Sequence, residues 1–230
     1  MGRDAFKNLP KLTTVKFGKF VDRENNPHDE FNGTITIGPG AFEGCTALTT
    51  IENSKRITTT KDRAFAGCTA LTSVDLSELT VVGKEDFAGC TSLSDVTTSE
   101  FTKIGKGMFE GCTALTSFTY GGQNIGSGAF ANCTNLTSVT LTSSDFRGIG
   151  ANAFENTAID NFTLPDGTYT IGDYAFKDCT ALTIVNLSDR TRPTFGRSVF
   201  IGATSFAGSS TSGFFIKGYS SWQNSNYSAS

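Results

Sequence analysis

The chain has few of the residues on which most catalytic sites depend. Among its 230 residues it contains one histidine, one tryptophan and two methionines. A Ser/His/Asp or Cys/His arrangement would have to use His28, which lies in a charged segment remote in sequence from every cysteine. The G-x-S-x-G nucleophile motif and the G-x-x-x-x-G-K-[ST] phosphate loop are absent as well. The sequence therefore predicts no catalytic residue, no cofactor and no enzyme activity.

An excess of charge of one sign and long apolar runs are also lacking. The net charge is −3 and the isoelectric point is about 5.2, whereas nucleic-acid-binding domains usually carry a basic patch. No apolar run approaches the roughly 18 residues of a membrane-spanning helix. We therefore expect no nucleic-acid partner and no membrane insertion of this segment. With 37% apolar and 18% charged residues, the chain has the composition of a folded protein.

What the chain does contain is an internal repeat anchored on phenylalanine. Clear copies read AFEGCTALTTI (41–51), AFAGCTALTSVDL (64–76) and AFKDCTALTIVNL (175–187). From the second anchor onward the spacing is 21–24 residues, within the range of leucine-rich repeats. We therefore expect about 8–9 repeats. Their anchors are Phe6, Phe42, Phe65, Phe87, Phe109, Phe130, Phe154, Phe176 and, in a degenerate copy, Phe200.

Each repeat has the pattern of one short strand. Leu71, Val74 and Leu76 follow an L-x-x-V-x-L spacing, which places apolar side chains on one face because strand side chains alternate. Ser73 and Asp75 then point to solvent. Upstream of the strand, the apolar residues recur at three- and four-residue intervals, which favours a helical or 3-10 turn that packs from the other side.

One such unit cannot bury its apolar face alone, so neighbours must stack into a continuous core. The predicted fold is a leucine-rich-repeat solenoid of the α/β type, in which short parallel strands alternate with helical or 3-10 turns and loops. With strands about 4.8 Å apart, the repeats would form a right-handed curved slab.

The L-x-x-[VIF]-x-L strand preceded by A-F-x-G-C-T-x-L resembles the BspA-like branch of the leucine-rich-repeat family, found on bacterial and some protozoan surfaces. The resemblance covers about residues 3–200. The chain departs from the commoner leucine-rich repeat because no asparagine follows the strand two residues on, so it should form no asparagine ladder.

The resemblance implies a non-catalytic binding module of a cell-surface or secreted protein. Its partner would be a host matrix or other protein, or a glycan. A passive structural spacer or stalk is the alternative. The chain opens inside a repeat and shows no signal peptide, so we expect an export signal to have been removed. We expect the domain to be a monomer.

Two segments interrupt the repeat pattern. Residues 19–35 form an insertion that is either a solvated loop or a projecting binding loop. We assign residues 1–203 to the solenoid and 204–230 to a C-terminal capping segment, because terminal repeats need a cap. The aromatic residues of that cap would be Phe214, Phe215, Tyr219, Trp222 and Tyr227.

The six cysteines occupy one position of the repeat, three residues after the anchor phenylalanine. Five lie in consecutive units and Cys179 is separated from them by Thr157, so complete pairing of neighbours is impossible. Successive cysteines are at least 21 residues apart, which does not fit a zinc site. We therefore expect no metal site and a column of buried free thiols. Its members are Cys45, Cys68, Cys90, Cys112, Cys133 and Cys179.

The exposed strand positions are the candidate binding residues. This face is rich in serine and threonine and nearly free of aromatic side chains, unlike strong protein interfaces. It is either a generic binding surface or simply a sheet whose exposed positions carry good strand formers. Tyr120 lies at a normally apolar position and should be half-buried. The candidates are Glu52, Ser73, Asp75, Asp95, Thr97, Ser117, Thr119, Ser138 and Thr140.

Overall fold

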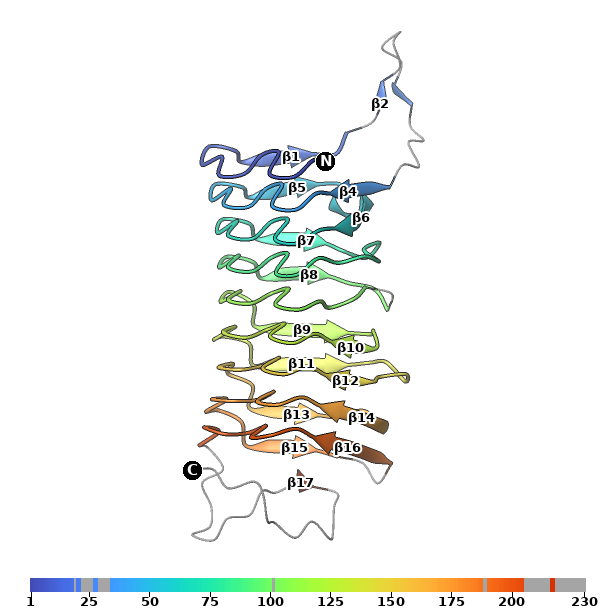
Figure 1. Ribbon diagram of the computed structural model, residues 1–230, viewed down its shortest axis with the longest axis vertical. Coiled ribbons are helices and arrows are strands. Elements are labelled where there is room, and N and C mark those ends of the chain that lie inside the picture. Colours follow the sequence, from blue (N-terminus) through green and yellow to red (C-terminus); the bar gives the residue numbers. More distant parts are fainter. Residues whose placement is uncertain are drawn as a thin grey trace.

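The computed structural model describes residues 1–18, 20–21, 27–28, 34–100, 102–187, 190–204 and 216–217. The described chain forms a parallel β-solenoid in which short turns stack along one axis in sequence order (Figure 1). The predicted solenoid of short parallel strands is therefore confirmed. Among the described residues no helix is long and apolar enough to cross a membrane.

The strands predicted from the L-x-x-V-x-L pattern form one side of the solenoid, which we call the first side. They pair in parallel as β1–β5, β7–β8, β9–β11 and β13–β15–β17, with interruptions between these groups. The strands of this side are β1 (Thr14–Lys16), β5 (Thr50–Glu52), β7 (Ser73–Asp75), β8 (Asp95–Thr97), β9 (Ser117–Tyr120), β11 (Ser138–Leu141), β13 (Asn161–Thr163), β15 (Ile184–Asn186) and β17 (Ile216–Lys217).

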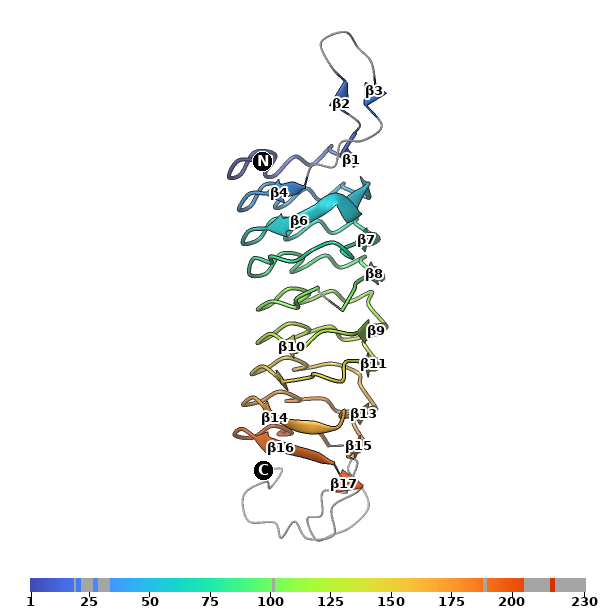
Figure 2. The same cartoon turned by 90° about the vertical axis from the view of Figure 1, so that its right-hand side faces the viewer.

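A second set of strands forms the adjoining side (Figure 2). Strand β4 pairs with β6, and β10, β12, β14 and β16 form a four-stranded parallel sheet. Isolated bridges join Thr59 to Val81 and Ile104 to Ile125. The strands of the second side are β4 (Ile35–Ile37), β6 (Ile57–Thr60), β10 (Asn124–Ile125), β12 (Gly148–Ile149), β14 (Gly167–Ile171) and β16 (Thr191–Phe195).

The two segments that interrupt the repeat are described only in part. Within the insertion, β2 (Phe20–Val21) pairs antiparallel with β3 (Pro27–His28), and most of its other residues lie outside the described part of the chain. The predicted capping segment also lies outside it, apart from β17 and the residue that closes the last turn. Strand β17 extends the first side by pairing with β15.

The segment around each anchor phenylalanine is a chain of hydrogen-bonded turns. The backbone N–H of Phe42 donates to the carbonyl of Ala64 in the next repeat at 2.8 Å, and that of Gly44 donates to Ala66 at 2.8 Å. Between them, Glu43 N–H donates back to Gly40 within the same turn at 3.0 Å. The backbone therefore bonds alternately within a turn and between turns, a pattern that no helix has.

The prediction of a helical or 3-10 turn at this position was therefore wrong. In the described residues, the 3-10 helix η1 (Ser54–Arg56) lies elsewhere, just after β5. The reason is a left-handed backbone two residues before and two residues after each anchor, which breaks any run of helical residues. The left-handed residues after the anchors are Asn8, Gly44, Gly67, Gly89, Gly111, Asn132, Asn156, Asp178 and Gly202.

The stack runs close to straight in both views rather than following the curve we expected (Figures 1 and 2). A helix is about 10 Å wide while strands lie about 4.8 Å apart, so helices on one side would wedge the repeats open there. With turns in their place, both sides have a similar spacing. About seven turns are complete, and the expected count of eight or nine repeats stays a prediction.

The core is a column of stacked phenylalanine rings. The rings of successive anchors lie nearly parallel, with centroids 5.1 Å apart between Phe42 and Phe65 and 5.9 Å apart between Phe87 and Phe109. Interior anchors such as Phe65 and Phe87 are fully buried. At the first turn the column ends on Phe6, whose side chain is 40% exposed. The distance between successive repeats therefore lets their phenylalanine rings stack on one another.

The six cysteines form a second buried column beside the rings, and all are free. The prediction of buried free thiols is confirmed. Each thiol donates to the carbonyl of the previous anchor phenylalanine, as from Cys68 to Phe42 at 3.2 Å and from Cys133 to Phe109 at 3.0 Å. Burial raises the pKa of the Cys90 and Cys133 thiols to about 12. The thiols are therefore protonated and inert at neutral pH.

We predict that these thiols react only when the protein unfolds. A colorimetric thiol reagent at pH 8 should titrate all six cysteines in denaturant and less than about one in the native protein. Rapid modification of the native protein would contradict the burial of the column.

A second prediction concerns the left-handed position after the anchor. Gly89 has φ +71°, and an added Cβ would meet only ordinary van der Waals neighbours. Gly89→Val should therefore destabilise the protein through backbone strain, by about 2 kcal/mol in urea unfolding. Gly89→Asn is the matched control and should cost well under half as much, since Asn132 occupies the same position with φ 61°. Equal losses in the two variants would rule out the backbone explanation.

Candidate functional site

The nine predicted binding residues lie on the outer face of the first side. All are exposed or partly exposed, and the register places Ser117 beside Ser138 and Thr119 beside Thr140. Likewise, Ser73 lies beside Asp95, one strand apart. The structure therefore brings these side chains into two rows, as expected from the strand pattern. That they bind a ligand stays a prediction.

Part of this polar surface has a structural role. The Asp75 carboxylate accepts a hydrogen bond from the backbone N–H of Ser77 at 3.0 Å, and Glu52 forms an ion pair with Lys16 at 2.8 Å. Just before the strands, the Thr49 hydroxyl donates to the Thr13 carbonyl at 3.0 Å, one turn away. The abundance of serine and threonine thus reflects the stacking of the turns as well as any surface function.

In the described part of the chain, strand pairing on the first side is interrupted at three junctions, and the turn before β9 borders the second of these. It carries β8 and Ile104, pairs with the preceding turn on the first side, and pairs with the following turn on the second side. No described strand pairing joins β8 to β9 or Val81 to Ile104. Thr98 stands here where four repeats have a strand-closing leucine, such as Leu76. A threonine supplies less apolar surface to hold the strand end against the core.

The following turn carries Tyr120 at the equivalent leucine position. Its side chain is buried, with 2% of its surface exposed, and its hydroxyl donates to the Asn124 carbonyl at 2.9 Å. The prediction that Tyr120 is half-buried was wrong, because this carbonyl satisfies the hydroxyl within the loop. Gly122 is required here, since a Cβ would lie 2.3 Å from the Tyr120 hydroxyl. Burial raises the pKa of Tyr120.

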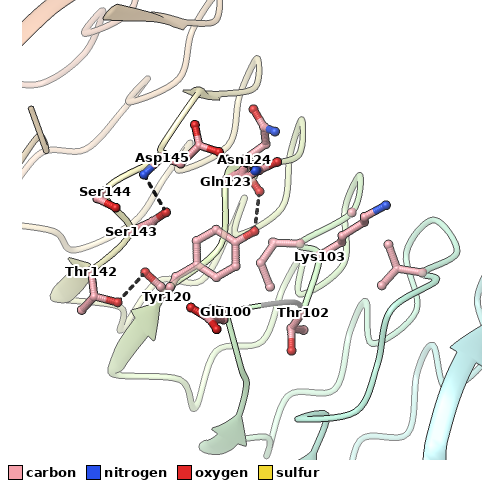
Figure 3. A pocket seen from close by; sticks show the side chains of 14 residues that line it. Glu100, Thr102, Lys103, Tyr120, Gln123, Asn124, Thr142, Ser143, Ser144 and Asp145 are labelled. Carbon is pink, nitrogen blue, oxygen red and sulfur yellow. Dashed lines mark hydrogen bonds between the residues drawn. The ribbon is translucent and has the colours of Figure 1, made fainter. Parts of the chain in front are cut away.

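Tyr120 borders an open cleft of about 670 Å³. The cleft lies where three successive loops leave the first side, after β8, β9 and β11, with Val82 of an earlier turn at its edge. Figure 3 shows Tyr120 at its centre, with Lys103 and Asp145 on opposite sides. We call it the loop cleft. Its polar side chains include Glu100, Lys103, Gln123, Asn124, Ser144 and Asp145.

The charges in the loop cleft are partly neutralised by the protein itself. Asp145 forms an ion pair with Arg147 at 2.9 Å and accepts a hydrogen bond from Gln123 at 2.6 Å. The hydrogen bond from Arg147 is the main cause that holds the pKa of Asp145 below its usual value. Glu100 and Lys103 carry opposite charges, and neither has an ion-pair partner in the described part of the chain.

None of the loop-cleft residues was predicted as a site from the sequence. The available signal lay in the departures from the repeat, namely Thr98 and Tyr120 at positions that hold leucine elsewhere. Such departures mark where the stack changes, but they cannot tell which loops then converge. In the described residues, no group of three or more His, Cys, Asp or Glu side chains could hold a metal ion.

Asp86 is a buried carboxylate outside the loop cleft. It replaces the alanine that precedes the anchor in most repeats, and its Oδ2 accepts hydrogen bonds from the Thr60 hydroxyl and from Gly83 N–H. Its Oδ1 is buried and has no partner among the described groups. Burial raises the pKa of Asp86 to about 6, although the Thr60 and Gly83 hydrogen bonds oppose the shift. The charged form of this carboxylate therefore destabilises the folded state.

The chain belongs to the family of BspA type leucine rich repeat regions, whose model matches six copies over residues 29–124 and 121–217. No curated protein sequence matches the chain. Among solved structures, a leucine-rich repeat protein from Bacteroides ovatus is similar with a TM-score of 0.71 and 25% identity, over 89% of this chain and 56% of that one. A leucine rich cell surface protein from Faecalibacterium prausnitzii gives 0.52 and 21% identity, over 89% and 61%. The chain thus spans less than two thirds of either protein.

We predict that Asp86 makes stability fall as the pH rises. Its folded pKa of about 6 lies above its ordinary 3.8, so the folded state holds the proton more tightly than the unfolded state. Its favourable effect is complete below about pH 4 and is lost as the pH rises through 6, by up to about 3 kcal/mol. Asp86→Asn should remove this contribution, measured as the difference in unfolding free energy between the variant and the native protein at each pH.

The matched control is Asp95→Asn, because the Asp95 side chain is exposed on the first side. The difference in unfolding free energy between Asp95→Asn and the native protein should change little over the same pH range. A pH profile of Asp86→Asn that parallels the native one would show that Asp86 does not titrate in this range.

Proposed function

We propose that this solenoid is a non-catalytic binding domain of a cell-surface or secreted protein, and that it takes a protein or glycan ligand. The observation that carries the proposal is the loop cleft, a hollow where three successive loops converge beside an interruption of the strand pairing. A repeat needed only for length has no use for such an irregularity, whereas clefts with a few convergent polar groups are the usual form of a ligand site. The rows of polar side chains on the first side provide an adjoining surface.

The family supports the proposed setting of the domain. Members of the BspA-like branch are described as surface or secreted proteins that bind partner proteins, and we extend both properties to this chain. Free buried thiols in place of a disulfide framework are compatible with this setting, because the stacked core holds the turns together without cross-links. We propose a monomer that acts as one part of a longer protein.

A passive spacer is the second candidate, and the regular core supports it. The phenylalanine column and the inter-turn hydrogen bonds run from the first turn to the last described one without a break. Such a column makes a stiff rod that could hold another domain away from a surface. The spacer needs no cleft, so the two candidates differ in whether the loop cleft matters.

A binding screen with two point variants separates these candidates. The purified protein would be tested against immobilised matrix and plasma proteins and a glycan array. Ser144→Arg places a large side chain in the loop cleft, and Ser73→Arg does the same on the first side; both serines are exposed, so the fold should tolerate either change. We expect saturable binding that Ser144→Arg weakens at least about tenfold, a loss of about 1.4 kcal/mol. A blank screen with a verified folded sample favours the spacer, and loss only in Ser73→Arg moves the site to the first side.

A further inference from the structure

We infer that the loop cleft is a site for a neutral oligosaccharide, bound through its hydroxyl groups. This inference rests on the proposed binding function and adds the chemical class of the ligand and the side chains that recognise it. Three properties of the cleft support it, namely its unused hydrogen-bonding groups, its balanced charge, and its size and apolar edge.

The loop cleft presents hydrogen-bonding groups that the fold does not use. The side chains of Glu100, Lys103 and Ser144 make no hydrogen bond or ion pair with any residue that the structure describes. Glu100 can only accept, Lys103 can only donate, and the Ser144 hydroxyl can do both. The Asn124 side chain adds an amide at the same site. Donors and acceptors side by side match a sugar, in which every hydroxyl is both.

The charge of the loop cleft favours a neutral ligand. Glu100 and Lys103 offset each other, while Arg147 neutralises Asp145 at 2.9 Å. The charges in and beside the cleft therefore sum to zero, so a charged ligand would gain no net electrostatic attraction from them. Phosphate, sulfated glycan and divalent cation are therefore disfavoured relative to an uncharged polyol.

The dimensions agree with a short chain of sugar rings. The volume of about 670 Å³ lies within the roughly 300–1,000 Å³ of small-molecule sites. Val82 and Ile104 form an apolar part of the lining, against which the C–H face of a pyranose ring can pack. Gly105 and Gly121 also line the cleft, and their lack of side chains lets a ligand approach the backbone.

The experiment is a titration of the folded protein with neutral di- to tetrasaccharides of glucose, galactose, mannose and N-acetylglucosamine, followed by calorimetry or by chemical-shift changes. Two cleft variants test the location. Ser144→Arg fills the cleft, and Lys103→Met removes the ammonium donors while it keeps the length of the side chain. Thr72→Arg is the matched control, because it adds a side chain of the same size and charge at an exposed position outside both the cleft lining and the candidate binding residues.

We expect at least one neutral oligosaccharide to bind, with an affinity that Ser144→Arg and Lys103→Met each lower about tenfold or more and that Thr72→Arg leaves within about twofold. The affinity should change little between 50 and 500 mM salt, because no net charge is neutralised. Tighter, salt-dependent binding of a sulfated oligosaccharide would overturn the inference, as would binding that the cleft variants do not alter.

The same panel separates this inference from the proposed function. A protein ligand that Ser144→Arg abolishes, together with no saccharide binding, keeps the binding function and rejects the sugar. If neither proteins nor saccharides bind to the verified folded protein, both proposals fail and the spacer remains.

Discussion

The rest of the structure depends on the hydrogen bonds between successive phenylalanine turns. At each junction the anchor and the left-handed residues on either side of it donate backbone N–H bonds to the next turn, as Phe87 does to Met108 at 2.9 Å and Gly89 to Glu110 at 2.7 Å. The strands, in contrast, are paired only in groups. The element that continues without a break through this solenoid is therefore the segment around each anchor phenylalanine, and not the strand. Because successive anchor rings lie 5.1 to 5.9 Å apart, within the range of favourable aromatic pairs, the phenylalanine column and the backbone bonds stabilise the same arrangement.

This continuity explains how the molecule tolerates an irregular turn. Between β8 and β9, whose turns carry Thr98 and Tyr120 in place of leucine, the strand pairing is lost, yet the anchors Phe87, Phe109 and Phe130 remain stacked. The loops after the strands are then free to differ from their neighbours, and the loop cleft lies among them. In a repeat protein whose surface otherwise copies itself, such a local departure is the place where a specific ligand can be distinguished.

The polar side chains likewise divide into those that stabilise the stack and those that are available to a ligand. Many of the hydroxyl groups bond to a carbonyl one turn away, as Thr137 does to Thr116 at 3.1 Å, so they satisfy the backbone at the edges of the stack. Asp86 shows the opposite case, a buried carboxylate with one oxygen unpartnered. Three groups of the described chain that have neither role, Glu100, Lys103 and Ser144, lie together in the loop cleft.

The sequence by itself determined the repeat, its family, the strand positions, the burial of the cysteine column and the outward direction of residues such as Ser117 and Thr140. Each of these follows from local periodicity, since a period of two decides which side chains face the core. The segment before each strand forms turns and not the expected helix because of left-handed residues such as Arg63 and Glu85. The identity of these residues does not indicate that conformation. Only the tertiary structure decided the burial of Tyr120 and the loop cleft. The burial of Tyr120 depends on how its own loop brings the Asn124 carbonyl to the hydroxyl, and the cleft arises where loops of different repeats converge, which the repeat pattern does not encode.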